Sequence, residues 1–196
     1  MGLEIERKFL VVNDGWKTSV VRRVQIRDGL IANSKGHKAR VRIADDVATI
    51  ALKSRKRGLV RIEFEYGIPY SDAQEILRIM CDGNVIDEVR HFVRYASNIW
   101  QVDVYEGLLD GVILAEIELT DADQKLKLRH WIGEEVSAGR GPSCQSDALI
   151  ARAEGDPSGY CRTLVRGTPA KIAMRTKVAG CDSPQSGVMY CWMGDG

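Results

Sequence analysis

The sequence predicts an α+β protein whose main element is a small antiparallel β-barrel with a charged interior. Segments in which charged and apolar residues alternate recur between residues 4 and 119, and their charged positions carry both signs. One stretch, at 70–80, shows helical spacing instead. Period-two segments are typical of strands, whereas apolar residues spaced by three and four are typical of a helix.

The first alternating segment begins at Glu4. In a strand, Glu4, Glu6 and Lys8 point to one face and the residues between them to the other. The pattern returns at 40–43, 50–53, 60–66, 101–105 and 116–119. For any single strand, the ordinary interpretation is a charged face that meets water. Its recurrence in six segments favours a shared interior.

Such an interior would combine many charges of both signs. The carboxylates are Glu4, Glu6, Glu63, Glu65, Asp103, Glu116 and Glu118, and the cations are Lys8, Arg40, Arg42, Lys53, Arg61 and Arg90. Burying this mixture is costly unless it is paired or bound to something, and a closed barrel with a wet lumen accommodates it. Clustered carboxylates suit Mg²⁺ or Mn²⁺, and arginine forks suit phosphate oxygens, so a metal-bound polyphosphate would engage both.

The segment 70–80 is predicted to be a helix on the outside of the barrel. Pro69 stands near its start, and Ser71 or Asp72 is expected to be the N-cap. The residues at helical spacing that we expect to cover the barrel are Ala73, Ile76, Leu77 and Met80. We therefore interpret this helix as a structural element that packs on the barrel and takes no part in catalysis.

A second short helix is expected to begin near Asp121 or Asp123. Between about residues 138 and 150 the apolar periodicity fades and Gly, Ser and Pro become frequent. We therefore expect a tunnel domain at 1–150 and a divergent, poorly ordered tail at 151–196. The five cysteines, expected to be reduced, are Cys81, Cys144, Cys161, Cys181 and Cys191, an odd number without the spacing of a zinc site.

Composition limits the partners. The chain of 196 residues has a formal net charge of +1, which gives no global signal for nucleic acid. Its N-terminus is too charged for the apolar core of a signal peptide, and no apolar run is long enough to span a membrane. We expect a cytoplasmic protein with no nucleic-acid or membrane partner.

The opening Glu4-Ile5-Glu6-Arg7-Lys8 resembles the ExExK signature of the CYTH superfamily, also called triphosphate tunnel metalloenzymes. Later segments match in the family's order: Arg40-Val41-Arg42, Arg61-Ile62-Glu63-Phe64-Glu65-Tyr66, Trp100-Gln101-Val102-Asp103-Val104-Tyr105 and Ala115-Glu116-Ile117-Glu118-Leu119. The resemblance covers about residues 2–137. It implies an eight-stranded antiparallel barrel around a tunnel, in a protein that is often a homodimer.

The resemblance also implies roles for the tunnel residues. It assigns metal binding to Glu4, Glu6, Asp103, Glu116 and Glu118, and places Glu63 and Glu65 at further tunnel positions. It assigns phosphate binding to Lys8, Arg40, Arg42, Lys53, Arg61 and Arg90. The catalytic set is Lys8, Glu4, Glu6 and Arg61. The expected activity is Mg²⁺- or Mn²⁺-dependent hydrolysis of inorganic tripolyphosphate or of an organic or nucleoside triphosphate. The alternatives are a class IV-type adenylate cyclase that forms cyclic AMP from ATP, a non-catalytic polyphosphate or nucleotide-binding protein, and a self-neutralising lumen that only supports the barrel.

Two tunnel positions depart from the family's pattern. The motif Arg-Gln-Gly-Tyr is replaced here by Arg27-Asp28-Gly29-Leu30, so that a tyrosine implicated in the choice of tripolyphosphate is absent. Glu88 occupies the position of a lysine two residues before the tunnel arginine, Arg90. These departures put the substrate and the strength of phosphate binding in question.

Overall fold

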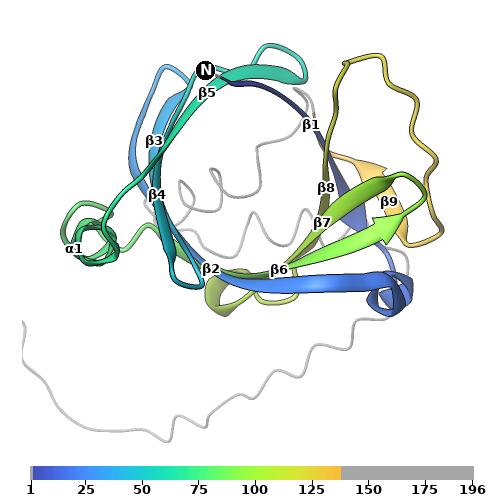
Figure 1. The fold of residues 1–196 in the computed structure, drawn as a ribbon, viewed down its shortest axis with the longest axis horizontal. Coiled ribbons are helices and arrows are strands. Elements are labelled where there is room, and N and C mark those ends of the chain that lie inside the picture. The colour runs from blue at the N-terminus through green and yellow to red at the C-terminus, as the bar shows by residue number, and fades with distance from the viewer. Residues whose placement is uncertain (1, 138–196) are drawn as a thin grey trace, which may run out of the picture.

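The computed structural model describes residues 2–137, and its strands form a closed antiparallel barrel (Figure 1). The strands of the ring are β1 (Gly2–Val11), β2 (Val20–Ser34), β3 (His37–Ala44), β4 (Val47–Lys53), β5 (Val60–Gly67), β6 (Val85–Tyr95), β7 (Asn98–Tyr105) and β8 (Ile113–Glu118). They are hydrogen-bonded in the order β5-β4-β3-β2-β6-β7-β8-β1, and β1 pairs with β5 to close the ring. The eight-stranded barrel is therefore confirmed.

Four further elements lie around the ring. They are a ninth strand, β9 (Ile132–Glu135), the α-helix α1 (Tyr70–Ile79), and two 3-10 helices, η1 (Asp14–Ser19) and η2 (Gly107–Leu109). Strand β9 pairs with the outer end of β1, where Phe9 lies opposite Glu135. Helix α1 lies outside the barrel beside β3 and β4 (Figure 1).

A two-residue turn fixes the register of β2 and β3. Lys35 and Gly36 both have positive φ, 49° and 85°, and connect Ser34 to His37, which are paired across the ladder. Positive φ at both central residues is the geometry of a type I′ turn, which matches the twist of the strands it joins. The resulting register places the central residues of β2 and β3 side by side in the barrel wall.

The largest apolar core lies on the outer face of the barrel. Phe9 packs against Trp100 with ring centroids 5.6 Å apart, and Trp100 packs against Trp131 at 5.8 Å. Trp16 from η1 joins the same cluster. The connection between β1 and β2 and the segment after β8 therefore cover this part of the wall and exclude water from it.

The predicted helix is confirmed, but two of its details are wrong. Ala73 and Leu77 are buried against the outer face of β3, whereas Met80 is 51% exposed because the helix ends at Ile79. The N-cap is Pro69 and no side chain caps the helix. Neither expected residue acts as the cap, because both lie inside the helix, where the Ser71 hydroxyl bonds to Asp72 instead.

The second helix, expected near Asp121, does not form within the described residues. The Asp121 carboxylate accepts a hydrogen bond of 2.7 Å from the backbone N–H of Asp123, and Gln124 accepts bonds from both the N–H and the hydroxyl of Thr120. Side-chain bonds of this kind compete with helical backbone bonds. The segment is therefore a turn that leads toward β9.

Among residues 2–137, no helix has the length and apolar character needed to cross a membrane. Cys81 is a free, buried thiol. The expected boundary at residue 150, the expected tail at 151–196, and Cys144, Cys161, Cys181 and Cys191 lie outside the described residues.

Candidate active site

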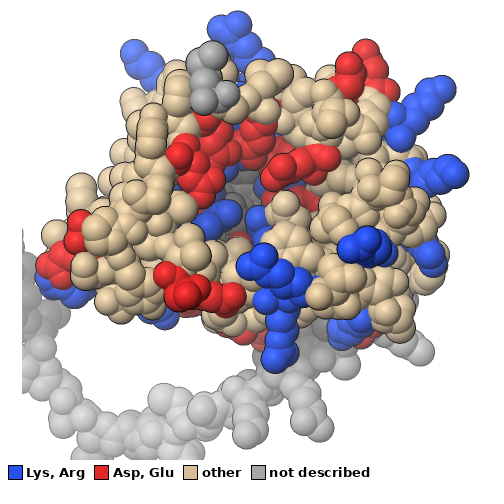
Figure 2. Space-filling model, in the orientation of Figure 1, with Lys and Arg blue, Asp and Glu red and all other residues tan. Residues whose placement is uncertain are grey.

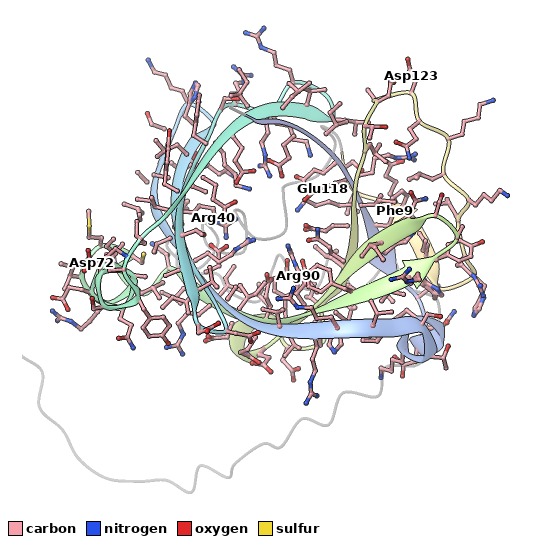
Figure 3. The ribbon with its side chains drawn as sticks, viewed as in Figure 1. Phe9, Arg40, Asp72, Arg90, Glu118 and Asp123 are labelled. Carbon is pink, nitrogen blue, oxygen red and sulfur yellow. The ribbon has the colours of Figure 1, made fainter. Side chains whose placement is uncertain are left out.

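The barrel encloses a cavity of about 370 Å³ that opens at the molecular surface, with charged side chains of both signs around it (Figure 2). All the cations predicted for the tunnel line it: Lys8, Arg40, Arg42, Lys53, Arg61 and Arg90. So do six of the predicted carboxylates: Glu4, Glu6, Glu63, Glu65, Glu116 and Glu118. Figure 3 shows Arg40, Arg90 and Glu118 reaching inward from different sides of the ring. The alternating segments thus share one interior.

Asp103 is the predicted site residue that does not line this cavity. It is fully buried in β7, and its two carboxylate oxygens accept bonds of 2.7 Å each from Arg90. Arg90 also approaches Glu116 at 3.4 Å. Asp103 therefore fixes the position of the Arg90 guanidinium without lining the cavity itself.

Strand register brings Lys8 to Glu116, which lies directly opposite it on β8. The Lys8 ammonium pairs with Glu116 and lies 3.6 Å from Glu6. Burial opposes the charge of Lys8, but these two carboxylates outweigh it and raise the pKa of Lys8. Burial likewise opposes the charge of Glu116, but Lys8 and Arg90 lower its pKa to about 2. Lys8 therefore remains an ammonium at neutral pH.

A second cluster joins β1, β4 and β5. Arg61 donates to the two oxygens of Glu4 at 2.6 and 2.9 Å and to Glu6 at 3.0 Å. Lys53 lies 3.0 Å from Glu63. When protonated, the Glu63 carboxyl donates a hydrogen bond to the ionised carboxylate of Glu4. Burial and the bond to Glu4 raise the pKa of Glu63 to about 7, whereas the pKa of Glu4 is lowered because Arg61 and Lys53 outweigh its burial.

The chemistry of these acids fits a divalent cation. Four carboxylates, those of Glu4, Glu63, Glu65 and Glu118, line a hollow of about 360 Å³ at one mouth of the tunnel. Within residues 2–137 no three acidic, histidine or cysteine side chains converge as a preformed metal centre. However, two carboxyl groups that share a proton form a site where a hard cation can replace it. Glu6 and Glu116, by contrast, are held by cations deeper in the tunnel.

Asp28 is a site residue that the sequence reasoning missed. It is 1% exposed, and each of its oxygens serves one arginine: Oδ1 lies 2.7 and 2.5 Å from Nε and Nη2 of Arg40, and Oδ2 lies 2.8 and 2.7 Å from Nε and Nη2 of Arg42. Burial opposes its charge, but the two guanidinium groups lower its pKa. Asp28 therefore fixes two of the predicted phosphate-binding arginines. The sequence signal that could have identified Asp28 is its spacing: it lies two residues from Ile26 on β2, so both side chains point to the same, inward face of the strand.

The two departures from the family pattern lie in the wall of the tunnel. Glu88 is completely buried, 3.9 Å from Arg90, and burial and the charge of Asp103 raise its pKa to about 7. Leu30 packs in an apolar cluster that includes Tyr105 and Leu114. An apolar side chain without a hydroxyl and a titratable carboxyl thus stand where the family pattern that the sequence resembles has a tyrosine and a lysine.

Three further cations line the cavity that the sequence reasoning did not assign to it: Lys38, Arg55 and Lys56. Lys56 lies 3.3 Å from Glu6. Two of these residues belong to the basic run Arg55-Lys56-Arg57 between β4 and β5. This basic run could have indicated further phosphate-binding residues, but it lies outside the segments in which charged and apolar residues alternate.

No protein-family model matches this chain. An inorganic triphosphatase of Acetivibrio thermocellus is 39% identical to it over 137 residues, which are 70% of this chain and 87% of the relative. The crystal structure of the inorganic triphosphatase NE1496 has a TM-score of 0.55 and 26% identity, and the match covers 76% of this chain and 96% of that one. A structure titled as the hypothetical protein NE1496 matches with a TM-score of 0.54 at 26% identity, over 74% of this chain and 97% of that one.

Proposed function

The chain belongs to the CYTH superfamily of triphosphate tunnel metalloenzymes, which includes its inorganic triphosphatase relatives, and from this premise we propose that it hydrolyses a triphosphate in its tunnel. The observation that carries the proposal is the single cavity in which six predicted cations face six predicted carboxylates. Hydrolysis adds the oxygen of water to the terminal phosphorus and breaks the bond to the bridging oxygen. Tripolyphosphate then yields orthophosphate and diphosphate.

The cations of the tunnel bind and orient the phosphates. Arg40 and Arg42 are held in fixed positions by Asp28, and Arg90 by Asp103. Fixed guanidinium groups need little reorganisation when charge builds up on phosphate oxygens, which is the main requirement of phosphoryl transfer. Lys8 adds a permanent positive charge beside them.

Activity in this family generally depends on a divalent metal, and Mg²⁺ or Mn²⁺ is the proposed ion here. Glu4, Glu63, Glu65 and Glu118 would hold it at the acidic mouth, where it would offset phosphate charge and orient a water molecule. Glu63 has to give up its proton before it can serve as a ligand. Because its pKa is about 7, metal binding should release a proton below neutral pH.

The proposal is tested by phosphate release from tripolyphosphate, ATP and thiamine triphosphate with Mg²⁺ or Mn²⁺. Glu4→Gln should abolish release at every metal concentration tried, because it removes a charged ligand and the partner of Arg61. Glu75→Gln, on the outer surface of α1, is the matched control and should retain activity. Full release by Glu4→Gln, with its fold confirmed by circular dichroism, would reject the metal assignment.

The alternatives give different products. Stabilisation by tripolyphosphate without any phosphate release would identify a binding protein, because a ligand that binds only the native state raises its melting temperature. Cyclic AMP formed from ATP would identify a cyclase. The cytoplasmic location, the homodimer and the absence of nucleic-acid partners stay predictions from the sequence.

A further inference from the structure

At Lys8 the first strand changes its neighbour on one edge. Residues 2–5 of β1 pair with β5 on this edge, whereas residues 9–11 pair with β9. Between these two ladders, the backbone N–H of Glu6 donates to the carbonyl oxygen of Leu59, just before β5 begins. Lys8 lies where neither strand continues its ladder, so the backbone groups of Lys8 need other partners on this edge.

Both backbone groups of Lys8 point toward the residues that follow β9. The N–H of Lys8 donates to the Ser137 hydroxyl at 2.8 Å, and the carbonyl oxygen of Lys8 accepts a bond of 2.8 Å from the N–H of Val136. Lys8 and Glu116, which lie opposite each other on the other edge, are therefore a non-hydrogen-bonded pair. In such a pair the two side chains approach most closely. The geometry that lets the ammonium reach Glu116 thus leaves the N–H of Lys8 to Ser137.

The Ser137 hydroxyl is held in turn by a carboxylate. Ser137 is buried and lines the charged cavity, and its hydroxyl donates to Oε1 of Glu135 at 2.6 Å. Arg7 donates to both oxygens of Glu135, at 2.8 and 2.5 Å, and is the main cause that lowers the pKa of this carboxyl. Donation to an ionised carboxylate strengthens the bond that the same hydroxyl accepts from Lys8, because bonds in a chain polarise one another.

We propose that Ser137 is a positioning residue for Lys8 in the hydrolysis of the triphosphate. Its hydroxyl, held by Glu135 and Arg7, fixes the backbone of β1 at Lys8 and so fixes the point from which the ammonium meets the phosphates. The inference rests on the proposed function and adds to it a residue that acts through Lys8. A merely structural Ser137 would stabilise the attachment of β9 without affecting turnover.

The test compares kcat and KM for tripolyphosphate in Ser137→Ala and Ser137→Thr. Ser137→Ala should lower kcat about fivefold, the factor that corresponds to the net free energy of one hydrogen bond. KM should change little, because the other cations of the cavity still bind the phosphates. Ser137→Thr retains a hydroxyl and should retain kcat. An unchanged kcat in Ser137→Ala, or equal losses in the two variants, overturns the inference.

Two controls separate positioning from a general loosening of the fold. Ser71→Ala removes an exposed hydroxyl from α1 and should leave both kinetic parameters unchanged. Ile132→Ala weakens the packing of β9 on the outer apolar cluster, so it should lower stability in urea without lowering kcat. If Ile132→Ala lowers kcat as much as Ser137→Ala does, the attachment of β9 and not the hydroxyl sets the activity, and the inference is overturned.

Glu135→Gln tests the route from the carboxylate through the hydroxyl. If Glu135 acts through Ser137, the variant that carries both substitutions should lose no more kcat than Ser137→Ala alone, because coupled residues are not additive. Losses that multiply would show that Glu135 acts independently and would contradict this route.

Hydrogen exchange of the Lys8 amide, followed by NMR, does not depend on turnover. This exchange should be faster in Ser137→Ala than in wild type, whereas the amide of Glu6, which donates to Leu59, should keep its protection. Equal exchange at Lys8 in the two proteins overturns the inference. A wild type that hydrolyses no triphosphate, but in which Ser137 still protects the Lys8 amide, rejects the proposed function and supports the positioning of Lys8.

Discussion

The two faces of the barrel wall are built from alternate residues of the same strands, but they stabilise different things. On β1, Lys8 faces the lumen and pairs with Glu116, whereas Phe9 faces outward and packs against Trp100. Outer contacts bury apolar surface, which is the main favourable contribution to folding. Buried ion pairs add little net stability, but they fix geometry. The outer face should therefore determine stability and the inner face activity.

The largest expected effect is on the outer face. Trp100 is fully buried between Phe9 and Trp131, and Trp100→Ala should lower the free energy of unfolding by about 3–5 kcal/mol. Urea denaturation measures this loss. The turnover of the molecules that remain folded, assayed at low temperature, should change little.

Ile62→Ala is the comparison variant, because Ile62 lies on the uncovered part of the outer face and is 42% exposed. It should cost much less stability than Trp100→Ala. A Trp100→Ala protein of normal stability would show that the outer aromatic cluster does not carry the fold.

An intermediate effect is expected at Asp28, on the inner face. Asp28→Asn removes the charge between Arg40 and Arg42, so the two guanidinium groups repel and lose their fixed positions. We expect kcat for tripolyphosphate to fall at least tenfold while KM does not rise, because the lumen gains net positive charge. Steady-state kinetics separates the two parameters.

Asp123→Asn, on the outside of the barrel (Figure 3), is the control for Asp28→Asn. It should leave both parameters unchanged. A raised KM with normal kcat in Asp28→Asn would contradict the positioning role, since it would indicate that Asp28 affects substrate binding only.

The smallest effect is a change of stability with pH. Burial is the main cause, and the negative charge of Asp103 the second, that raises the pKa of Glu88 to about 7. The folded protein therefore binds the proton of the Glu88 carboxyl more tightly than the unfolded chain does. Its contribution to stability is therefore lost as pH rises from about 4.5 to 7. Glu88→Gln lacks this loss, and its stability relative to wild type should increase by about 1–3 kcal/mol between pH 5 and pH 8.

Urea denaturation of both proteins at the two pH values, without metal, tests this expectation. Glu134→Gln, on an exposed side chain of β9, controls for the general effect of removing a carboxylate. A stability difference between Glu88→Gln and wild type that stays constant with pH would show that Glu88 is not protonated in the folded protein.

Errors in the sequence prediction occur where local patterns compete. Ser71 is a good cap residue, but Pro69 starts the helix two residues earlier. Asp121 is also a plausible cap, yet its carboxylate closes a turn with Asp123. A favourable residue type specifies only that a local bond can form. The neighbouring backbone decides which of several bonds it makes.

The sequence by itself determined which face of each alternating segment points into the lumen, because period two is a property of each strand alone. It also determined that the lumen carries both signs of charge. The tertiary structure decided which charges meet. Glu4 lies beside Arg61 and Asp28 holds both Arg40 and Arg42 because ring closure and hairpin register place these strands together. Pairing between distant segments depends on the whole sheet, and the residue pattern of a single strand does not specify its partner.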